Sequence, residues 1–323
     1  MTTGNHGRRA LAAGALAAAL RPDAACAQGV RALRLVVPFA AGGGSDNVAR
    51  IIAGPIGAAL GRAVLVDNRP GAGGSIGAAE VARAAPDGDT LLLDAYSHLL
   101  VPILMPRPPV VYETAFTPIS LVALLPQLVV VRAASPDRTL AELLARARAR
   151  PGALVFAVPG NGTQQHLAGA ALFRRAGVDV LGVPYRGAAA AVQAVLSGEA
   201  DLAINLSVAL PMVRDGALRA LAVTSAGQLP ALPNVPTVAE AGFPGFDMSE
   251  WSGIWGPAGL PEPMIVRLHA AVAAAVGNEG VSARLGGLGA VPVGSAPKAF
   301  AVAIARQRAV AREVVGAAGI TLD

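Results

Sequence analysis

The sequence predicts an α/β protein built from two lobes. Short β-branched apolar runs alternate along the chain with stretches whose apolar residues recur at helical spacing. This alternation is typical of helices packed on largely parallel sheets. The chain has 323 residues, more than a usual domain of about 100 to 200 residues. Because a strand, a glycine-rich loop and a helix open each half, we expect two related lobes rather than a solenoid.

The first half begins with the segment 33–39, LRLVVPF, which predicts a strand. The loop AAGGGSD follows, and apolar residues then recur at helical spacing from Val48 to Leu60. Further strands are expected at 64–66 and 90–93. We expect Ser45 or Asp46 to cap the first helix and Ser75 to cap the second, because serine and aspartate are preferred at that position.

The second half repeats this order, with an apolar strand at 154–158 and the loop PGNGT before a helix. A helix at 188–197 is expected to end at Gly198, since glycine commonly terminates helices. The remaining expected elements are strands at 180–184, 202–205 and 220–223 and helices at 264–276 and 297–315.

The N-terminus predicts a secretory signal peptide over residues 1–27. Arg8 and Arg9 precede an apolar run at 10–20, which is shorter than the roughly 20 residues of a membrane span. Small residues then allow cleavage after Ala27, which predicts a periplasmic mature protein. Twin-arginine export and a lipid anchor at Cys26 remain alternatives. Asp23 and Pro22 disfavour the anchor, because lipoprotein signals need an aliphatic residue three positions before the cysteine.

Composition excludes several other classes. Hydrophobic residues make up 54% and charged residues 15% of the chain, as in a globular protein. Cys26 is the only cysteine, which removes disulfides and thiol chemistry from the mature chain. The net charge of +5 falls to about +3 without the signal peptide, and no basic stripe predicts nucleic-acid binding. The four histidines are scattered and no phosphate-binding motif occurs, so we expect no metal and no cofactor.

Two glycine loops are the best candidates for a binding site. In segment 38–46, PFAAGGGSD, glycines let backbone amides turn toward a ligand, and the helix behind them adds unpaired N–H groups. Such an arrangement suits an anion, although glycine-rich turns before helices also occur without ligands. Segment 159–163 repeats the device before Gln164, Gln165 and His166. Amides from opposite lobes could therefore hold the two ends of a short diacid.

Two further segments are weaker candidates. The loop at 68–75, NRPGAGGS, offers glycines and Arg69, but arginine there more often makes a structural salt bridge. Tyr185 and Arg186 follow a strand, where a ring and a guanidinium could contact an acidic ligand. A packed ring with a solvated arginine is an equally good interpretation.

The ordered set of motifs resembles the Bug family of tripartite tricarboxylate transporter substrate-binding proteins over nearly all of the mature sequence. No single motif decides this; their order does. The motifs are PFAAGGGSDNVAR, VLVDNRPGAGGSIGAAEVARAAPDGDTLLL, FTPISLVA, GTQQHLAG, VPYRGAAAAVQAVLSGEADL, LRALAVTS, LPNVPTVAEAGFPGF and WSGIWGPAGLP.

The resemblance implies a type II periplasmic-binding-protein fold with crossing strands between two lobes that close over an organic acid. Lobe 1 would hold residues 28–124 and 251–323, and lobe 2 residues 125–250. The partners would be the acid and the integral-membrane permease subunits of a tripartite tricarboxylate transporter, with the protein a monomer. The implied ligand-binding residues are Phe39, Ala40, Ala41, Gly42, Gly43, Asp46, Ser97, Asn161, Gly162, Thr163, His166, Tyr185 and Arg186.

The chain also departs from the family pattern. Pro55 lies within the first expected helix, and Asp89 replaces a usual aromatic residue. Segment 98–111 is unusual for the family. Residues 95–98 are expected to edge the cleft, where the bulky Tyr96 and His98 would reshape the pocket. The ligand cannot therefore be inherited from the family. For His166, a structural role that ties the loop down is favoured over a ligand contact.

Two other functions are compatible with parts of the sequence. Segment 73–77, GGSIG, fits the G-x-S-x-G nucleophile elbow, and Asp201 and His269 follow in hydrolase order. An elbow needs its serine directly after a buried strand, however, and RPGAGG separates Ser75 from VLVDN. We therefore predict no enzyme. A ligand sensor for a membrane receptor would have the same sequence features and stays open.

Overall fold

The structure is a computed structural model that describes residues 31–321, and its strands form two mixed sheets flanked by helices. This confirms the predicted α/β class. The expectation of largely parallel sheets is wrong, because the strands that connect or border the two sheets, among them β4, β5 and β10, pair antiparallel to their neighbours. The predicted signal segment, with Arg8, Arg9, Cys26 and the cleavage after Ala27, lies outside the described residues. Within 31–321, none of the helices combines the length and the apolar character that crossing a membrane requires.

The first sheet has six strands in the order β11-β4-β10-β3-β1-β2. β1 pairs in parallel with β2 and β3, whereas β10 runs antiparallel to β3 and β4. The strands are β1 (Leu33–Val37), β2 (Val64–Asn68), β3 (Thr90–Asp94), β4 (Phe116–Leu125), β10 (Glu250–Pro257) and β11 (Val291–Pro292). The accompanying helices are α1 (Gly44–Leu60), the 3-10 turn η1 (Ala72–Gly74), α2 (Ser75–Ala82), α3 (Ser97–Leu104), α8 (Glu262–Val276), α9 (Glu279–Gly287) and α10 (Pro297–Ala318).

The second sheet has five strands in the order β7-β6-β8-β5-β9. β6 is parallel to β7 and β8, and β5 is antiparallel to β8 and β9. The strands are β5 (Leu128–Arg132), β6 (Val155–Val158), β7 (Leu181–Pro184), β8 (Leu202–Ile204) and β9 (Leu218–Val223). Its helices are α4 (Leu140–Ala149), α5 (Gln164–Ala176), α6 (Ala188–Ser197) and α7 (Ala209–Arg214).

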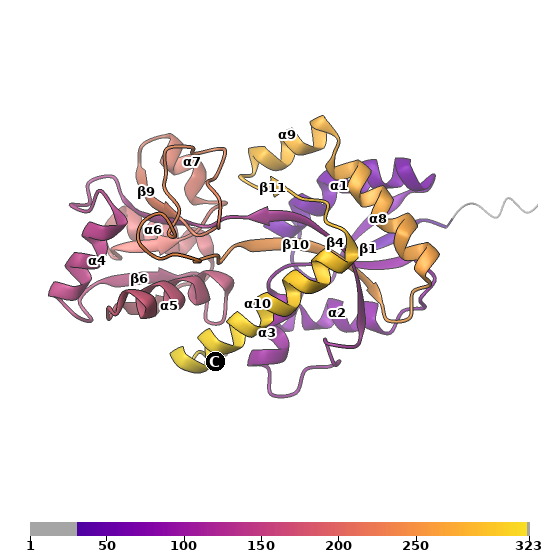
Figure 1. Cartoon of the computed structure of the whole chain (residues 1–323), viewed down its shortest axis with the longest axis horizontal. Coiled ribbons are helices and arrows are strands. Elements are labelled where there is room, and N and C mark those ends of the chain that lie inside the picture. Colours follow the sequence, from indigo (N-terminus) through magenta and orange to yellow (C-terminus); the bar gives the residue numbers. More distant parts are fainter. Residues whose placement is uncertain (1–30, 322–323) are drawn as a thin grey trace, which may run out of the picture. The chain divides into compact units, whose positions relative to one another are not determined.

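The two sheets are joined by β4 and β10, which lie side by side (Figure 1). Their pairing runs from Glu250 opposite Leu125 to Pro257 opposite Phe116. β4 leads within three residues into β5 of the second sheet, and β10 carries the chain back. Trp251 and Trp255 of β10 are 1% and 2% exposed and pack with Phe300 of α10. The crossing strands are therefore anchored in an aromatic core.

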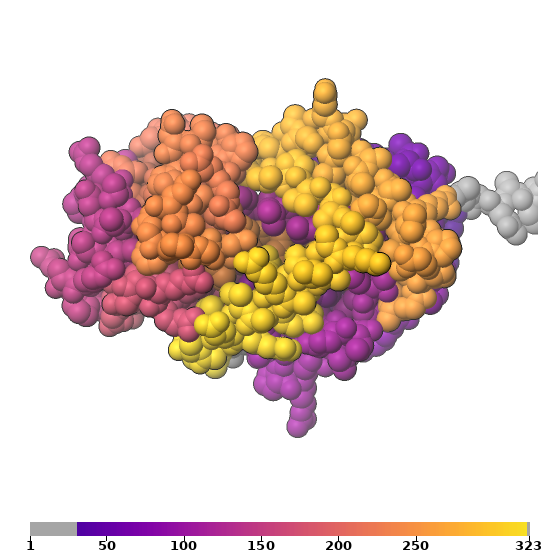
Figure 2. Space-filling model, in the orientation of Figure 1, coloured from indigo at the N-terminus to yellow at the C-terminus, as the bar shows by residue number. Residues whose placement is uncertain are grey.

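The C-terminal helix α10 spans the same junction. It packs on β4 and α3 and also contacts α5, which belongs with the second sheet. Gln307 of α10 accepts a hydrogen bond from Nε1 of Trp251, and Glu313 pairs with Arg174 of α5 at 2.7 Å. Figure 2 shows this helix in yellow on the surface, where it meets the magenta residues of the second sheet's helices. The helix thus ties both sheets to the crossing strands.

The helix starts differ from the expected serine and aspartate caps. Gly43 is the N-cap of α1 and Gly74 that of α2, without a side-chain capping bond. The carboxylate of Asp46 instead accepts the N–H of Gly42 at 2.8 Å, one turn before the helix. Ser75 is the first residue of α2 because the preceding Gly74 has φ 97°, a left-handed conformation that glycine adopts without strain. Gly198 does end α6 in the left-handed conformation, as predicted.

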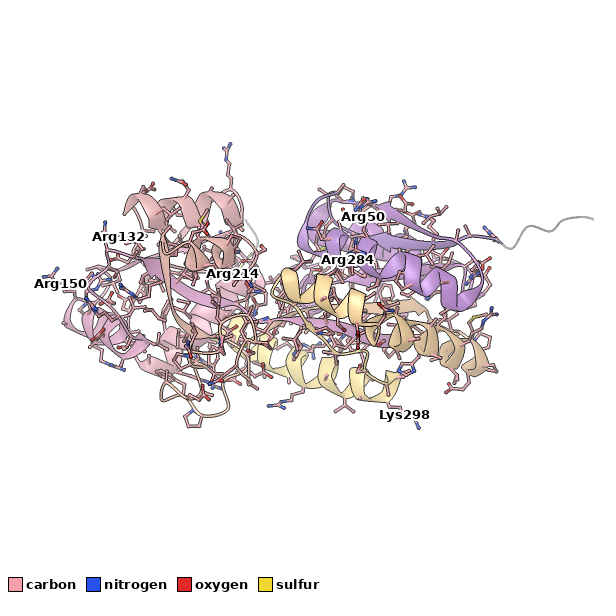
Figure 3. All side chains as sticks on the ribbon, turned by 90° about the horizontal axis from the view of Figure 1, so that it is seen from above. Arg50, Arg132, Arg150, Arg214, Arg284 and Lys298 are labelled. Carbon is pink, nitrogen blue, oxygen red and sulfur yellow. The ribbon has the colours of Figure 1, made fainter. Side chains whose placement is uncertain are left out.

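Positive side chains are spread over the described residues. Figure 3 shows Arg132, Arg150 and Arg214 on the part of the chain that holds the second sheet. Arg50, Arg284 and Lys298 lie on the part that holds the first.

Gly253 in β10 tests how tightly the crossing strands are packed. A Cβ there would collide with the ring of Phe300 and approach Trp255 at 3.0 Å. Gly253→Ala should therefore lower the free energy of unfolding by about 1–3 kcal/mol through overpacking, measured by urea denaturation. Gly316→Ala is the matched control, because a Cβ at this exposed helical position meets nothing within 4 Å. Equal midpoints for Gly253→Ala and the parent protein would show that β10 accommodates the added group.

Candidate ligand-binding site

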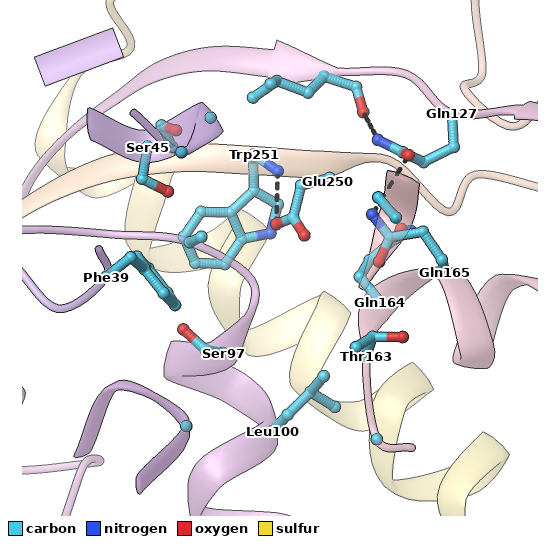
Figure 4. Close-up of a pocket in the computed structure, with 18 of the residues that line it drawn as sticks. Phe39, Ser45, Ser97, Leu100, Gln127, Thr163, Gln164, Gln165, Glu250 and Trp251 are labelled. Atoms are coloured by element: carbon cyan, nitrogen blue, oxygen red, sulfur yellow. Dashed lines mark hydrogen bonds between the residues drawn. The ribbon is translucent and has the colours of Figure 1, made fainter. Parts of the chain in front are cut away.

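A cavity of about 460 Å³ lies where the two sheets meet, within the usual range of about 300 to 1,000 Å³ for small-molecule sites. Its lining comes from the loops after β1, β2 and β3, from the crossing strands, and from the loops after β6 and β8 (Figure 4). Segments from far apart in the chain thus converge on one space. The contributing positions include Phe39, Gly43, Gly44, Ser45, Ala72, Gly73, Ser97, Leu100, Gln127, Asn161, Gly162, Thr163, Gln164, Gln165, Asn205, Ser207, Glu250, Trp251 and Ser252.

The N-terminus of α1 forms one wall. Gly43, Gly44 and Ser45 line the cavity, and the first intrahelical bond is donated by Asn47 to the carbonyl of Gly43. Among the described residues, the N–H groups of Gly44 and Ser45 therefore have no acceptor, as expected of a first helical turn. The loop is held by Asp46, which is 1% exposed and accepts from Gly42, Arg50 and Asn68.

The N-terminus of α5 forms the opposing wall. Asn161, Gly162, Thr163, Gln164 and Gln165 line the cavity. Thr163 caps the helix by accepting the N–H of His166 at 3.3 Å, and Nδ1 of His166 accepts the N–H of Gly162 at 3.3 Å. His166 thus ties the loop down, as the favoured interpretation of the sequence expected. Burial lowers the pKa of His166, which keeps the ring neutral and able to accept.

These two helix starts give the cavity two electropositive ends. The aligned peptide dipoles of a helix place roughly half a positive charge at its N-terminus. No arginine, lysine or histidine side chain is among the described residues that line the cavity, and Glu250 is its one charged side chain. An anionic group would therefore be held by backbone amides rather than by a side-chain cation.

The model of the tripartite tricarboxylate transporter family receptor matches residues 48–318. The chain belongs to this family. A UPF0065 protein from the tcbD-tcbE intergenic region of a Pseudomonas species is 40% identical over 304 residues, 92% of this chain and 90% of that protein. Protein BugT of Bordetella pertussis is 36% identical over 271 residues, 83% of each chain. Family members are periplasmic solute-binding receptors, which also confirms the predicted Bug resemblance.

Solved structures agree with this assignment. An R. palustris protein solved with adipate superposes with a TM-score of 0.79 at 32% identity, covering 92% of this chain and 100% of that chain. MatC from Rhodopseudomonas palustris, solved with malate, gives a TM-score of 0.74 at 34% identity, covering 89% and 99%. The fold is therefore the two-lobed fold of periplasmic binding proteins, as predicted.

The structure brings some of the residues implied by the family resemblance to the cavity and leaves others outside its lining. Those that line it are Phe39, Gly43, Ser97, Asn161, Gly162 and Thr163. Those that do not are Ala40, Ala41, Gly42, Asp46, His166, Tyr185 and Arg186. The loop at 68–75, a weaker candidate, does contribute Ala72 and Gly73, while its Arg69 contacts Asp67 at 3.1 Å.

Two of the residues outside the lining are engaged with other side chains. Hydrogen bonds to the Asp46 carboxylate from Arg50, from the backbone N–H of Gly42 and from Asn68 lower the pKa of Asp46 to about 2. The carboxylate therefore stays ionised and continues to accept these bonds, which hold the loop. The hydroxyl of Tyr185 donates to Glu199 at 2.7 Å, and Arg186 is exposed. Tyr185 therefore faces α6 and its end rather than the cavity.

The expectation that Tyr96 and His98 edge the cleft is wrong. Both are buried, with 2% and 1% exposure, because the chain turns into α3 directly after Asp94. His98 stacks on Trp255 with ring centroids 4.2 Å apart, and its Nδ1 lies 3.3 Å from Asp94. The alternate positions Ala95 and Ser97 face the cavity instead. The aromatic core therefore takes up the bulky side chains of this segment, and the small side chains of Ala95 and Ser97 line the cavity.

Sequence reasoning missed the contribution of the crossing strands. Glu250, Trp251 and Ser252 at the start of β10 line the cavity, as does Gln127 between β4 and β5. One feature of the sequence could have indicated this contribution: Glu250 is an acidic residue in the segment EWSGIWGP, which otherwise has no charged residue. A carboxylate at the edge of a buried strand is unusual unless a partner group or a ligand pairs with it.

Glu250 has an unusual electrostatic setting. Its Oε1 accepts the backbone N–H groups of Tyr96 at 2.8 Å and Trp251 at 3.1 Å. Burial, reinforced by the Asp94 carboxylate, nevertheless raises the pKa of Glu250 from 4.5 to about 7, against the effect of these two donors. The charge on Glu250 therefore costs stability in the free protein.

Among the described residues, no hydrogen bond joins the three residues of the hydrolase pattern. Asp201 pairs with Arg146 at 2.7 Å and accepts the N–H of Val155 in the second sheet. Ser75 is 3% exposed in α2, and Nε2 of His269 on α8 has no hydrogen-bond partner among the described residues.

The raised pKa of Glu250 predicts a pH-dependent stability. A carboxyl group with a folded pKa above its unfolded value stabilises the fold fully below about pH 4.5, and that contribution is lost as pH rises through about 7. Between pH 5 and pH 8, Glu250→Gln should therefore gain stability relative to the parent protein, by on the order of 1 to 3 kcal/mol, measured by urea denaturation. Glu262→Gln, at an exposed position, is the control that should follow the parent protein. Parallel profiles for Glu250→Gln and the parent would contradict the raised pKa.

Proposed function

We propose that this chain captures a small organic acid in the cavity and delivers it to the integral-membrane permease subunits of a tripartite tricarboxylate transporter. The observation that carries the proposal is the pair of facing helix N-termini, whose unpaired amides line one cavity without a basic side chain among the described lining residues. Family membership supports the transport role. The relatives solved with adipate and with malate support a carboxylate ligand.

The chemistry of these helix starts favours carboxylates over neutral solutes. Each carboxylate oxygen can accept two hydrogen bonds, and charge-assisted bonds to N–H groups are stronger than neutral ones. Gly44 and Ser45 on one side and Gln164 and Gln165 on the other offer donors to separate ends of one ligand. A neutral sugar would leave the two positive helix ends uncompensated.

The lobes of the proposed receptor are residues 28–124 with 251–323 and residues 125–250. Since β4 and β10 are the paired connections between the sheets, bending at their ends would let the lobes close over a ligand. Residues of both lobes would then share the acid, which favours the closed form by differential contacts. Closure presents a changed surface to the permease.

The remaining roles follow from this proposal. Phe39, Gly43, Ser97, Asn161, Gly162 and Thr163 contact the ligand, whereas Ala40, Ala41, Gly42, Asp46, His166, Tyr185 and Arg186 shape or support the loops. The protein acts as a periplasmic monomer after removal of residues 1–27, with no cofactor, no metal and no catalytic step.

Gly44→Pro tests the amides of the first wall. Gly44 is the first helical position, where proline is well tolerated, and the preceding Gly43 is extended at φ −73° and ψ 171°, which suits a residue before proline. The substitution therefore removes one N–H while keeping the fold. We expect at least a tenfold loss of carboxylate affinity, roughly 1.4 kcal/mol, measured by calorimetry with the acid that gives the largest thermal shift in a screen of mono-, di- and tricarboxylates.

Gly44→Ala is the matched control, because it keeps the N–H and its Cβ meets nothing within 4 Å. It should bind like the parent protein. Equal affinities for Gly44→Pro and Gly44→Ala would remove this helix start from the site. Absence of any thermal shift with all acids, for ligand-free protein that melts cooperatively, would contradict the proposed function itself.

A further inference from the structure

We propose that the acid captured by this chain also carries a protonated amine, and that Glu250 receives this amine. The inference rests on the proposed function, because it names the substrate class of the same cavity. The ligand class is thus an aminocarboxylate, with its carboxylate at a helix N-terminus and its ammonium group at the crossing strands. Glu250 acts as the specificity-determining residue.

The geometry of Glu250 leaves one carboxylate oxygen for a ligand. Oε1 takes both backbone hydrogen bonds, from Tyr96 and Trp251. Oε2 accepts none from the described residues, although the side chain lines the cavity. Figure 4 shows one oxygen bonded to the backbone of Trp251 and the other directed away from it. The two backbone bonds fix the carboxylate in place, so that its free oxygen is presented in a defined position.

The described residues that line the cavity supply no side-chain cation to this oxygen. Glu250 is the one charged side chain among the described residues that line the cavity, and the buried carboxylate of Asp94 lies close enough to act on it. Oε1 of Gln164, a lining residue with 2% exposure, also has no hydrogen-bond donor among the described residues. A partly buried carboxylate without a counter-charge is costly, and an ammonium group would supply the charge and a donor for its free oxygen.

The rest of the cavity complements the other end of such a ligand. The starts of α1 and α5 provide positive helix ends and free amides, while the start of β10 provides the negative group. A simple diacid would satisfy the helix starts but would face Glu250 with a like charge. The alternative is that a protonated Glu250 donates a hydrogen bond to a second carboxylate, and this alternative predicts the opposite dependence on pH.

Titration of Glu250 separates these two cases. The charged group that acts on Glu250 is Asp94 of β3, whereas Asp247 before β10 acts on the neighbouring Tyr96. His98 of α3 lies 3.3 Å from Asp94. With the pKa of Glu250 near 7, an ammonium group binds better as the carboxyl ionises. Affinity for an aminocarboxylate should therefore rise at least threefold from pH 5.5 to pH 8, whereas affinity for the matched acid without the amine should fall.

The test measures affinities by calorimetry for pairs of acids that differ only by an amine. Suitable pairs are succinate and aspartate, glutarate and glutamate, and 3-phenylpropionate and phenylalanine, all at pH 8. We expect the amine-bearing member of at least one pair to bind tenfold more tightly. Glu250→Gln, which keeps an oxygen for the two backbone donors, should abolish that preference, while the exposed Glu262→Gln should retain it.

Each outcome decides the proposal. Tighter binding of the amine-free member in every pair that binds, or a preference unchanged in Glu250→Gln, would overturn the inference and leave the proposed function standing. Binding of none of the acids would contradict the proposed function and the inference together. If Glu250→Gln failed to fold, the pH dependence of the parent protein would decide: affinity for the aminocarboxylate that falls with rising pH would overturn the proposal.

Discussion

The pairing of β4 with β10 is the constraint on which the rest of the structure depends. It joins the two sheets, and it fixes the register that puts Glu250 opposite Leu125 at the end of β10 beside the second sheet. The aromatic cluster of Trp251, Trp255 and Phe300 packs against the same strand and resists its displacement. The paired strands β4 and β10 are thus held by packing along their middle, whereas the proposed bending takes place at their ends.

The same constraint explains how one cavity obtains both signs of charge. Positive ends come from helices, whose dipoles are a property of the backbone and need no particular side chain. The full negative charge comes from a side chain on β10, which crosses between the sheets and reaches the cavity that both helix starts line. Glu250 occupies that position, and two backbone N–H groups hold its carboxylate where burial disfavours the charge. The cost of this charge in the free protein becomes a source of selectivity when a cation arrives.

Much of the fold followed from local patterns because strand, glycine loop and helix lie next to one another in the sequence. The loops at 38–46 and 159–163 were located by glycines whose backbone role is local, and both reach the cavity with Gly43 and Gly162. Long-range packing was not accessible in this way. His98 turns into the core because Trp255, more than 150 residues later, offers a face for stacking. Glu250 reaches the cavity through strand pairing that local periodicity does not encode.

Backbone amides and side chains have different roles in the site, and this difference explains how the ligand specificity of such receptors can change. Amides at helix starts bind a carboxylate whatever the neighbouring side chains are, so loops of this kind can be kept while the ligand changes. Relatives at 32% and 34% identity hold acids as different in length and polarity as adipate and malate on the same fold. Discrimination must then come from positions outside the helix starts. In this chain those positions include the beginning of β10 and the side chains of Gln127 and Gln164. A single substitution there changes the charge that a ligand meets and leaves the loops that hold its carboxylate unaltered.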